Sequence, residues 1–112
     1  MIKINIKPEK RWDVVYETSN WRVGIYVPEN TSINDVNYLE KHDKPELFYL
    51  VKGKIVLVLS SDGKEIKEVE MEKDKIYIVT EWHNAYRPDG AEGIALVIEA
   101  PDINTEYMKF SN

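Results

Sequence analysis

Short runs of alternating apolar and polar residues follow one another along the chain. Successive side chains of a strand point to opposite faces, so this period of two indicates strands with one buried face. Proline, glycine, asparagine and aspartate separate the runs and are typical of turns. The runs expected to form strands are residues 2–6, 11–18, 21–27, 47–51, 55–59, 66–71, 76–79 and 94–98. No segment has the apolar period of a helix of ordinary length, and the sequence therefore predicts an all-β fold.

Three segments carry additional information about the fold. Residues 55–59 are all apolar, which indicates a strand that is buried on both faces. Residues 61–64, Ser-Asp-Gly-Lys, are typical of a hairpin turn. Residues 34–42 are ambiguous, because they fit either a strand or a short helix. Short strands separated by turns are typical of a sandwich or barrel, so we expect one such domain over residues 1–112.

The stretch 40–53 concentrates the candidate chemistry. Glu40, His42 and Glu46 are three potential metal ligands within seven residues. They share even parity, so on one extended chain their side chains would point to the same face. Pro45 argues against a continuous helix through this stretch. We therefore expect the three side chains on one face of extended chain that leads into a strand.

The spacing in residues 34–53 resembles motif one of the cupin superfamily. In that motif a glycine, a His-x-His pair, a glutamate and a second glycine follow one another at set distances. The positions are filled here, in turn, by Asn34, Glu40, His42, Glu46 and Gly53. Asparagine in place of glycine is a mild change, since it also tolerates a left-handed backbone. The departure that matters is Glu40, because it replaces the family's first histidine ligand by a different possible ligand.

A second and weaker resemblance covers residues 72–87. When the family's second motif is aligned on His83, only that histidine matches. The cupin resemblance implies a small antiparallel β-barrel, a double-stranded β-helix of the jelly-roll type. It also implies that His42, Glu46 and His83 hold one divalent metal inside the mouth of the barrel.

The chemistry of these residue types points the same way. Neutral imidazole and carboxylate together suit Mn, Fe, Zn or Ni. His42, Glu46 and His83 could form a triad of two histidines and one carboxylate, with positions left open for a substrate. The chain has only two histidines, and both fall on motif positions. Glu40 is either a fourth ligand or a hydrogen-bond partner of His42. A shared metal requires the two imidazoles to lie within about 10 Å of each other.

Composition narrows the classes of partner. The 112 residues carry a net charge of −5 and show no basic patch, so nucleic acid is not an expected partner. Cysteine is absent, and no disulfide framework is expected. No apolar run is long enough to span a membrane, and the N-terminus is unlike a signal peptide. We therefore expect a cytoplasmic protein that makes no membrane contact.

Two classes of function fit these observations. The first is a small metal-dependent enzyme, such as an oxygenase, isomerase or lyase, that acts on a small organic molecule. The second is a non-catalytic module that binds a small molecule or a metal, or a barrel whose site is degenerate. A fold does not choose between them, because one fold serves many functions.

The first strands also suggest a mode of assembly. Trp12, Tyr16, Trp21 and Tyr26 offer more aromatic surface than one small barrel can easily cover. The cupin resemblance implies pairing through such strands. We therefore expect a homodimer with roughly the first 25 residues at its interface.

Overall fold

The computed structural model describes residues 1–111 and shows a chain built of short strands. The strands are β1 (Trp12–Glu17), β2 (Arg22–Tyr26), β3 (Tyr38–His42), β4 (Glu46–Gly53), β5 (Val56–Ser60), β6 (Lys67–Glu70), β7 (Ile76–Val79), β8 (Trp82–Tyr86), β9 (Gly93–Glu99) and β10 (Thr105–Lys109). Two short 3₁₀ helices, Ile33–Asp35 and Pro88–Gly90, lie in the connections. The all-β prediction is confirmed. Within residues 1–111, no helix is long and apolar enough to cross a membrane.

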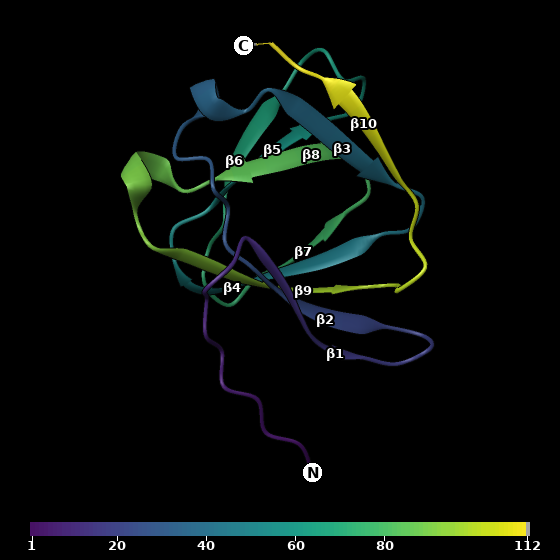
Figure 1. Ribbon diagram of the computed structural model, residues 1–112. Coiled ribbons are helices and arrows are strands. Elements are labelled where there is room, and N and C mark those ends of the chain that lie inside the picture. Colours follow the sequence, from purple (N-terminus) through teal and green to yellow (C-terminus); the bar gives the residue numbers. More distant parts are fainter. Residues whose placement is uncertain (112) are drawn as a thin grey trace.

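The strands form two five-stranded antiparallel sheets that face each other (Figure 1). Sheet I, the lower one in the figure, has the order β1-β2-β9-β4-β7, and sheet II, the upper one, has the order β10-β3-β8-β5-β6. The chain crosses repeatedly between the sheets, so that β3 and β4 are neighbours in sequence but lie in different layers. This arrangement is a jelly-roll sandwich and confirms the predicted antiparallel jelly-roll fold.

Apolar side chains from both sheets pack in the space between them. Phe48 of β4 and Val97 of β9 meet Leu57 of β5 there. The prediction that β5 is buried on both faces is confirmed, because the adjacent Val58 belongs to a second cluster, which also contains Leu39 of β3. Close packing on these strands holds the neighbouring interior side chains in fixed positions.

The predicted strand over residues 2–6 is wrong. Residues 1–10 form no strand and run away from both sheets in Figure 1. The side chains of Ile2, Ile4 and Ile6 are 66%, 42% and 40% exposed. Alternation gives a stable strand only where a neighbouring strand pairs with its backbone, and no strand among residues 1–111 does so here.

The ambiguity over residues 34–42 has a mixed outcome. A 3₁₀ helix ends at Asp35, and β3 then begins at Tyr38. β10 pairs with β3 and places Thr105 opposite His42. Because β3 lies between β10 and β8, its polar end is held by strands from two distant parts of the chain.

Candidate functional site

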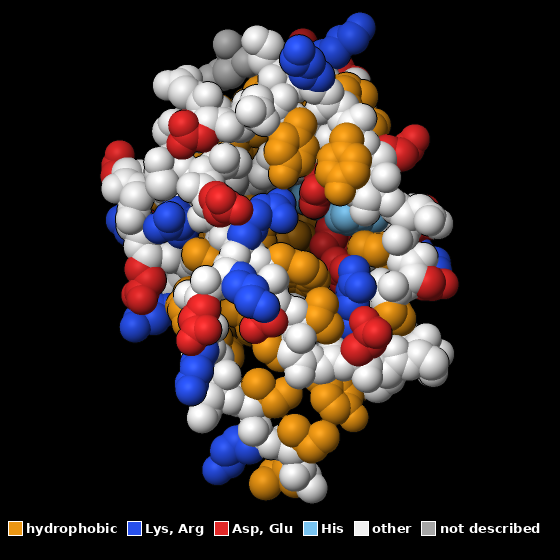
Figure 2. Space-filling model, viewed as in Figure 1, with side chains coloured by type: hydrophobic (Ala, Val, Ile, Leu, Met, Phe, Trp, Pro, Cys, Tyr) orange, Lys and Arg blue, Asp and Glu red, His pale blue; other side chains and the backbone are white. Residues whose placement is uncertain are grey.

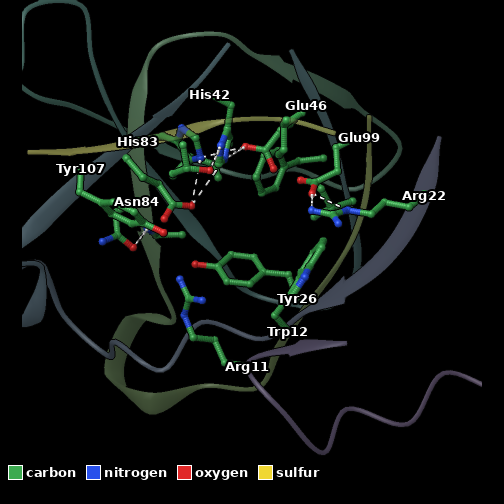
Figure 3. Close-up of a pocket in the computed structure, with 17 residues that line it drawn as sticks. Arg11, Trp12, Arg22, Tyr26, His42, Glu46, His83, Asn84, Glu99 and Tyr107 are labelled. Atoms are coloured by element: carbon green, nitrogen blue, oxygen red, sulfur yellow. Dashed lines mark hydrogen bonds and ion pairs between the residues drawn. The ribbon is translucent and has the colours of Figure 1, made fainter. Parts of the chain in front are cut away.

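The four side chains expected at the site converge between the two sheets (Figure 3). Glu40 and His42 lie on β3, and His83 lies on the neighbouring β8, where it is the register partner of Glu40. Glu46 is the first residue of β4 in the facing sheet. In Figure 3 the side chains of His42, His83 and Glu46 point toward one another.

The prediction that these side chains lie on one face of a single extended segment is wrong. Parity predicts that Glu40, His42 and Glu46 share one face of a single extended chain. Instead the chain leaves sheet II after His42 and enters sheet I at Glu46. Pro45 lies in this crossing, where its missing N–H removes a donor that a continued strand would need. Glu46 therefore faces His42 across the interior.

The inner nitrogens of the two histidines approach the same carboxylates. Oε1 of Glu46 lies 2.8 Å from Nε2 of His42 and 3.0 Å from Nε2 of His83. Oε1 of Glu40 lies 3.6 and 3.7 Å from these two nitrogens. The centres of the two imidazole rings are 5.1 Å apart, well within the limit predicted for a shared metal. Each of the two imidazole nitrogens thus lies within 4 Å of both carboxylates.

The outer nitrogens of the histidines have protein partners. Nδ1 of His83 donates to the backbone carbonyl of Glu81 at 3.0 Å. Nδ1 of His42 lies 2.8 Å from the hydroxyl of Thr105. When Nδ1 carries the proton, the neutral ring presents the lone pair of Nε2 to the interior, as a metal ligand must. Thr105 comes from a strand that the sequence analysis did not identify.

No lysine or arginine among residues 1–111 pairs with the carboxylates of the cluster. Glu46 Oε1 is buried and makes no well-directed hydrogen bond to the described residues, despite the two short contacts. Burial lowers the pKa of His42, but Glu40 and Glu46 outweigh burial and raise this pKa to about 10. Burial also opposes a charge on His83, yet Glu46 raises its pKa. The two carboxylates therefore attract a cation to the imidazole nitrogens.

That cation can be a proton or a metal ion, because both compete for the same lone pairs. The donor set, two imidazoles with carboxylates, is one that divalent Mn, Fe, Zn or Ni accepts. Ligand atoms of Glu40, His42 and His83 all lie within 4.8 Å of one another. The residues present therefore fit a divalent metal, which would also satisfy Glu46 Oε1, a buried atom that accepts no hydrogen bond from the described residues.

A cavity of about 180 Å³ opens beside the cluster. Its wall combines the four clustered side chains with apolar groups, among them Trp12, Phe48, Leu57 and Val97. Figure 2 shows histidine and acidic side chains at the bottom of a hollow on this face of the molecule. A small molecule in this cavity would lie directly beside the cluster.

Comparison with known proteins identifies the fold. No family model and no curated protein sequence matches the chain. Among solved structures, a cupin-2 domain protein from Shewanella frigidimarina NCIMB 400 matches with a TM-score of 0.59 and 14% identity, over 80% of this chain and 78% of that chain. This chain has the cupin fold.

Two further cupin-fold matches have functional names. HppE, solved with Fe(II) and substrate, matches with a TM-score of 0.60 and 13% identity over 86% of this chain. The chain spans only 56% of the HppE chain. The polyketide cyclase RemF from Streptomyces resistomycificus matches with a TM-score of 0.50 and 17% identity, over 93% of this chain and 84% of that chain. Identities this low establish the fold and leave the function to the site itself.

The cupin barrel also contains an ion pair that sequence reasoning missed. Glu99, at the end of β9, accepts hydrogen bonds from Nε and Nη2 of Arg22 at 2.8 and 2.5 Å. Burial and the neighbouring Glu46 raise the pKa of Glu99 to about 7, although Arg22 opposes this shift. One signal was available, since Glu99 shares its parity with the apolar Ala95 and Val97 and must face the interior with them.

The face of β2 toward the cavity differs from the one that apolarity alone suggests. Arg22 and Tyr26 line the cavity, although the alternating apolar residues lie on the other face. Gly24 between them leaves room for Trp12, whose ring carbon Cη2 would lie 2.1 Å from a Cβ at this position. Two aromatic residues assigned by the sequence analysis to a dimer surface, Trp12 and Tyr26, thus line the site.

Proposed function

We propose that this protein is a metal-binding cupin in which His42, His83, Glu46 and Glu40 hold one divalent transition metal. The observation that carries the proposal is the convergence of two buried imidazole nitrogens on two carboxylates that pair with no lysine or arginine among the described residues. A bound metal would supply a Lewis acid that polarises an oxygen of a small molecule beside it. The protein would supply the rigid ligands and the enclosing wall.

Glu40 fits the role of a ligand better than that of a partner orienting His42. An orienting partner binds the outer nitrogen of the imidazole, and Thr105 occupies that position. Glu40 approaches the inner nitrogens instead. A second carboxylate makes the site harder, so Mn or Fe should be preferred over Cu or Ni. The cupin-fold neighbour HppE has been solved with Fe(II) and with Co(II), which is in keeping with a site for such metals.

The cavity supports a small-molecule site over a degenerate barrel. In a degenerate cupin, side chains would fill the interior next to the cluster, whereas here about 180 Å³ lies open beside it. Metal, open space and a water-excluding wall are the components of a metal-dependent enzyme. An oxygenase, isomerase or lyase acting on a small organic molecule is the function this combination supports best. A non-catalytic metabolite-binding protein is the alternative.

Elemental analysis tests the proposal. Protein purified without added metal or chelator should contain about one divalent transition metal per chain, held by ligands at protein-typical distances. His83→Ala should lose that metal. Glu106→Gln, which removes an exposed carboxylate from β10, is the matched control and should keep it. Wild-type protein that stays metal-free after incubation with Mn(II) and Fe(II) would overturn the proposal.

We also propose a homodimer that uses the N-terminal segment. Ile2, Ile4 and Ile6 are exposed and alternate with polar residues, as in a strand that awaits a neighbour. Tyr16 and Trp21 form an exposed ring pair with centres 5.7 Å apart. A second copy can supply the missing sheet edge, which is the common way in which an extended segment binds a sheet.

Light scattering distinguishes the assembly states. Wild-type protein should be dimeric at micromolar concentration. Replacing Ile2, Ile4 and Ile6 together by serine should give a folded monomer, while replacing Lys3 and Lys7 by serine should leave the dimer intact. A wild-type monomer at this concentration would contradict the proposed dimer.

A further inference from the structure

The cavity contains a second cationic side chain, Arg11, which precedes β1. Arg11 lines the cavity opposite the histidines, and its guanidinium points into the space between them in Figure 3. Its contacts there are with tyrosines. Nη2 donates to the hydroxyl of Tyr38 at 3.4 Å, and the guanidinium carbon lies 5.6 Å from the ring centre of Tyr26.

Arg11 and Arg22 differ in how their charges are compensated. Arg22 forms ion pairs with Glu99 at 2.5 Å and with Glu17 at 3.7 Å. Within residues 1–111, Arg11 forms no ion pair with any carboxylate. A guanidinium is always charged and presents a planar fork of donors that matches a carboxylate. Arg11 therefore offers most of its donors to whatever fills the cavity.

Tyr26 adds a neutral donor next to Arg11. Its hydroxyl points into the same space in Figure 3 and has no hydrogen-bond partner among the described residues. Burial raises the pKa of Tyr26, so the hydroxyl keeps its proton near neutral pH. A guanidinium and a phenol that converge on one space are complementary to an oxyanion.

The charged groups around the cavity favour an anion with a single negative charge. A divalent metal on neutral His42 and His83 is balanced by the carboxylates of Glu46 and Glu40. Arg22 is balanced by Glu99. Arg11 has no ion-pair partner among residues 1–111, so its end of the cavity is positive and favours an anion. A monoanion neutralises this charge, whereas a dianion such as hydrogen phosphate overshoots.

We infer that the site takes a small organic monocarboxylate, with the carboxylate on Arg11 and Tyr26 and a second oxygen turned toward the metal. This inference rests on the proposed metal site and adds the substrate class to it. The cavity of about 180 Å³ is smaller than the pockets of about 300 to 1,000 Å³ that hold drug-sized ligands, so the molecule has few carbon atoms. The apolar wall at Phe48 and Val97 contacts those carbons.

Ligand titration of Co(II)-loaded protein tests this inference, because the visible spectrum reports both metal binding and changes at the metal. Glycolate is the monocarboxylate probe, glycolamide is its neutral counterpart, and inorganic phosphate is the dianion. Glycolate should bind at least about tenfold more tightly than glycolamide, as expected for a hydrogen-bonded charge. Phosphate should bind more weakly than glycolate.

Variants localise the effect to the cavity wall. Arg11→Gln should weaken glycolate binding about tenfold or more and leave Co(II) affinity unchanged. Tyr26→Phe should weaken glycolate binding by a smaller factor. Lys10→Gln removes the same charge one residue away on an exposed side chain and should change neither affinity. Recovery of part of the glycolate affinity in Arg11→Lys would show that the charge is what matters.

The outcomes separate this inference from the proposed function. Unchanged glycolate binding in Arg11→Gln, with Co(II) still bound, would overturn the carboxylate inference and leave the metal site standing. Arg11-dependent binding of phosphate that exceeds that of glycolate would also overturn it. A wild-type protein that gives no Co(II) spectrum before any anion is added would overturn the metal site, and the inference with it.

Discussion

Two charged clusters share the interior of this cupin fold, and they balance their charges differently. Glu99 is matched by Arg22, so that cluster is complete within the protein. Glu46 and Glu40 face two imidazoles instead, and among residues 1–111 neither has a lysine or arginine partner. A buried carboxylate without a partner is costly. The comparison shows that the first cluster is an arginine–carboxylate pair, whereas the second, without lysine or arginine, could hold a cation from solution.

The largest effect is expected when the complete cluster is broken. Arg22→Gln leaves Glu99 buried without a counter-charge, and the free energy of unfolding should fall by about 3 kcal/mol, the lower end for buried pairs. The lower end applies because the Arg22 side chain is 22% exposed. Urea denaturation measures the change, and Arg22→Lys is the control that keeps the charge. A fall below about 1 kcal/mol, the value of a surface pair, would contradict this and would mean that the buried Glu99 takes up a proton when Arg22 is removed.

The second effect is stabilisation of the incomplete cluster by metal. Mn(II) at about a hundred times its dissociation constant should raise the free energy of unfolding of the wild type by about 2.7 kcal/mol. Glu46→Gln should abolish this gain, and Glu106→Gln should keep it. Thermal unfolding with and without Mn(II) measures the difference. Equal stabilisation of wild type and Glu46→Gln would mean that Mn(II) binds elsewhere.

The thermal stability of the metal-free protein should also depend on pH through His42. In metal-free protein the pKa of His42 is raised from 6.5 to about 10. A raised histidine pKa stabilises the fold fully below pH 6.5, and this contribution is lost as the pH rises toward 10. The midpoint of thermal unfolding of chelated protein should therefore fall over this range. Mn(II)-loaded protein should show little of this fall, since the metal replaces the proton.

His42→Gln sharpens this prediction. The variant removes the titrating ring, so the fall between pH 6.5 and 10 should become shallower in chelated protein. A chelated wild type whose unfolding midpoint rises with pH over this range would show that the carboxylates do not hold a proton on His42.

The smallest expected effect concerns Glu40. Glu40→Gln should weaken Mn(II) binding by about tenfold or more, and Glu40→His should retain binding while shifting preference toward Ni and Cu. Competitive metal titrations measure both. Unchanged Mn(II) affinity in Glu40→Gln would reduce the site to a triad of His42, Glu46 and His83.

The sequence predicts most strands, and the side chains that converge between the sheets, because both depend on local spacing. Period-two apolar runs locate most strands, and the spacing around His42 and Glu46 identifies the cupin motif. Parity alone could not predict that the chain crosses from one sheet to the other between β3 and β4. The spacing between His42 and Glu46 is the same whether the chain stays in one strand or bends near Pro45. The same side chains converge by a different path.

The interior charges were harder to predict, since they depend on which face of a strand turns inward. Arg22 and Tyr26 share a face of β2 that looks like the solvent side in the sequence, yet this face lines the cavity. Arg11 lies outside any strand, and its position follows from how β1 packs. The failed strand over residues 2–6 has a similar cause, because pairing depends on a partner that sequence alternation does not reveal.

The position of the metal tests the central claim most directly. Crystals grown with Mn(II) should give an anomalous difference peak within coordination distance of Nε2 of His42, Nε2 of His83 and a carboxylate oxygen of Glu46. Crystals of Glu46→Gln should lack this peak. Peaks confined to surface carboxylates, with the His42 and His83 nitrogens bonded only to Glu46 or water, would contradict the account.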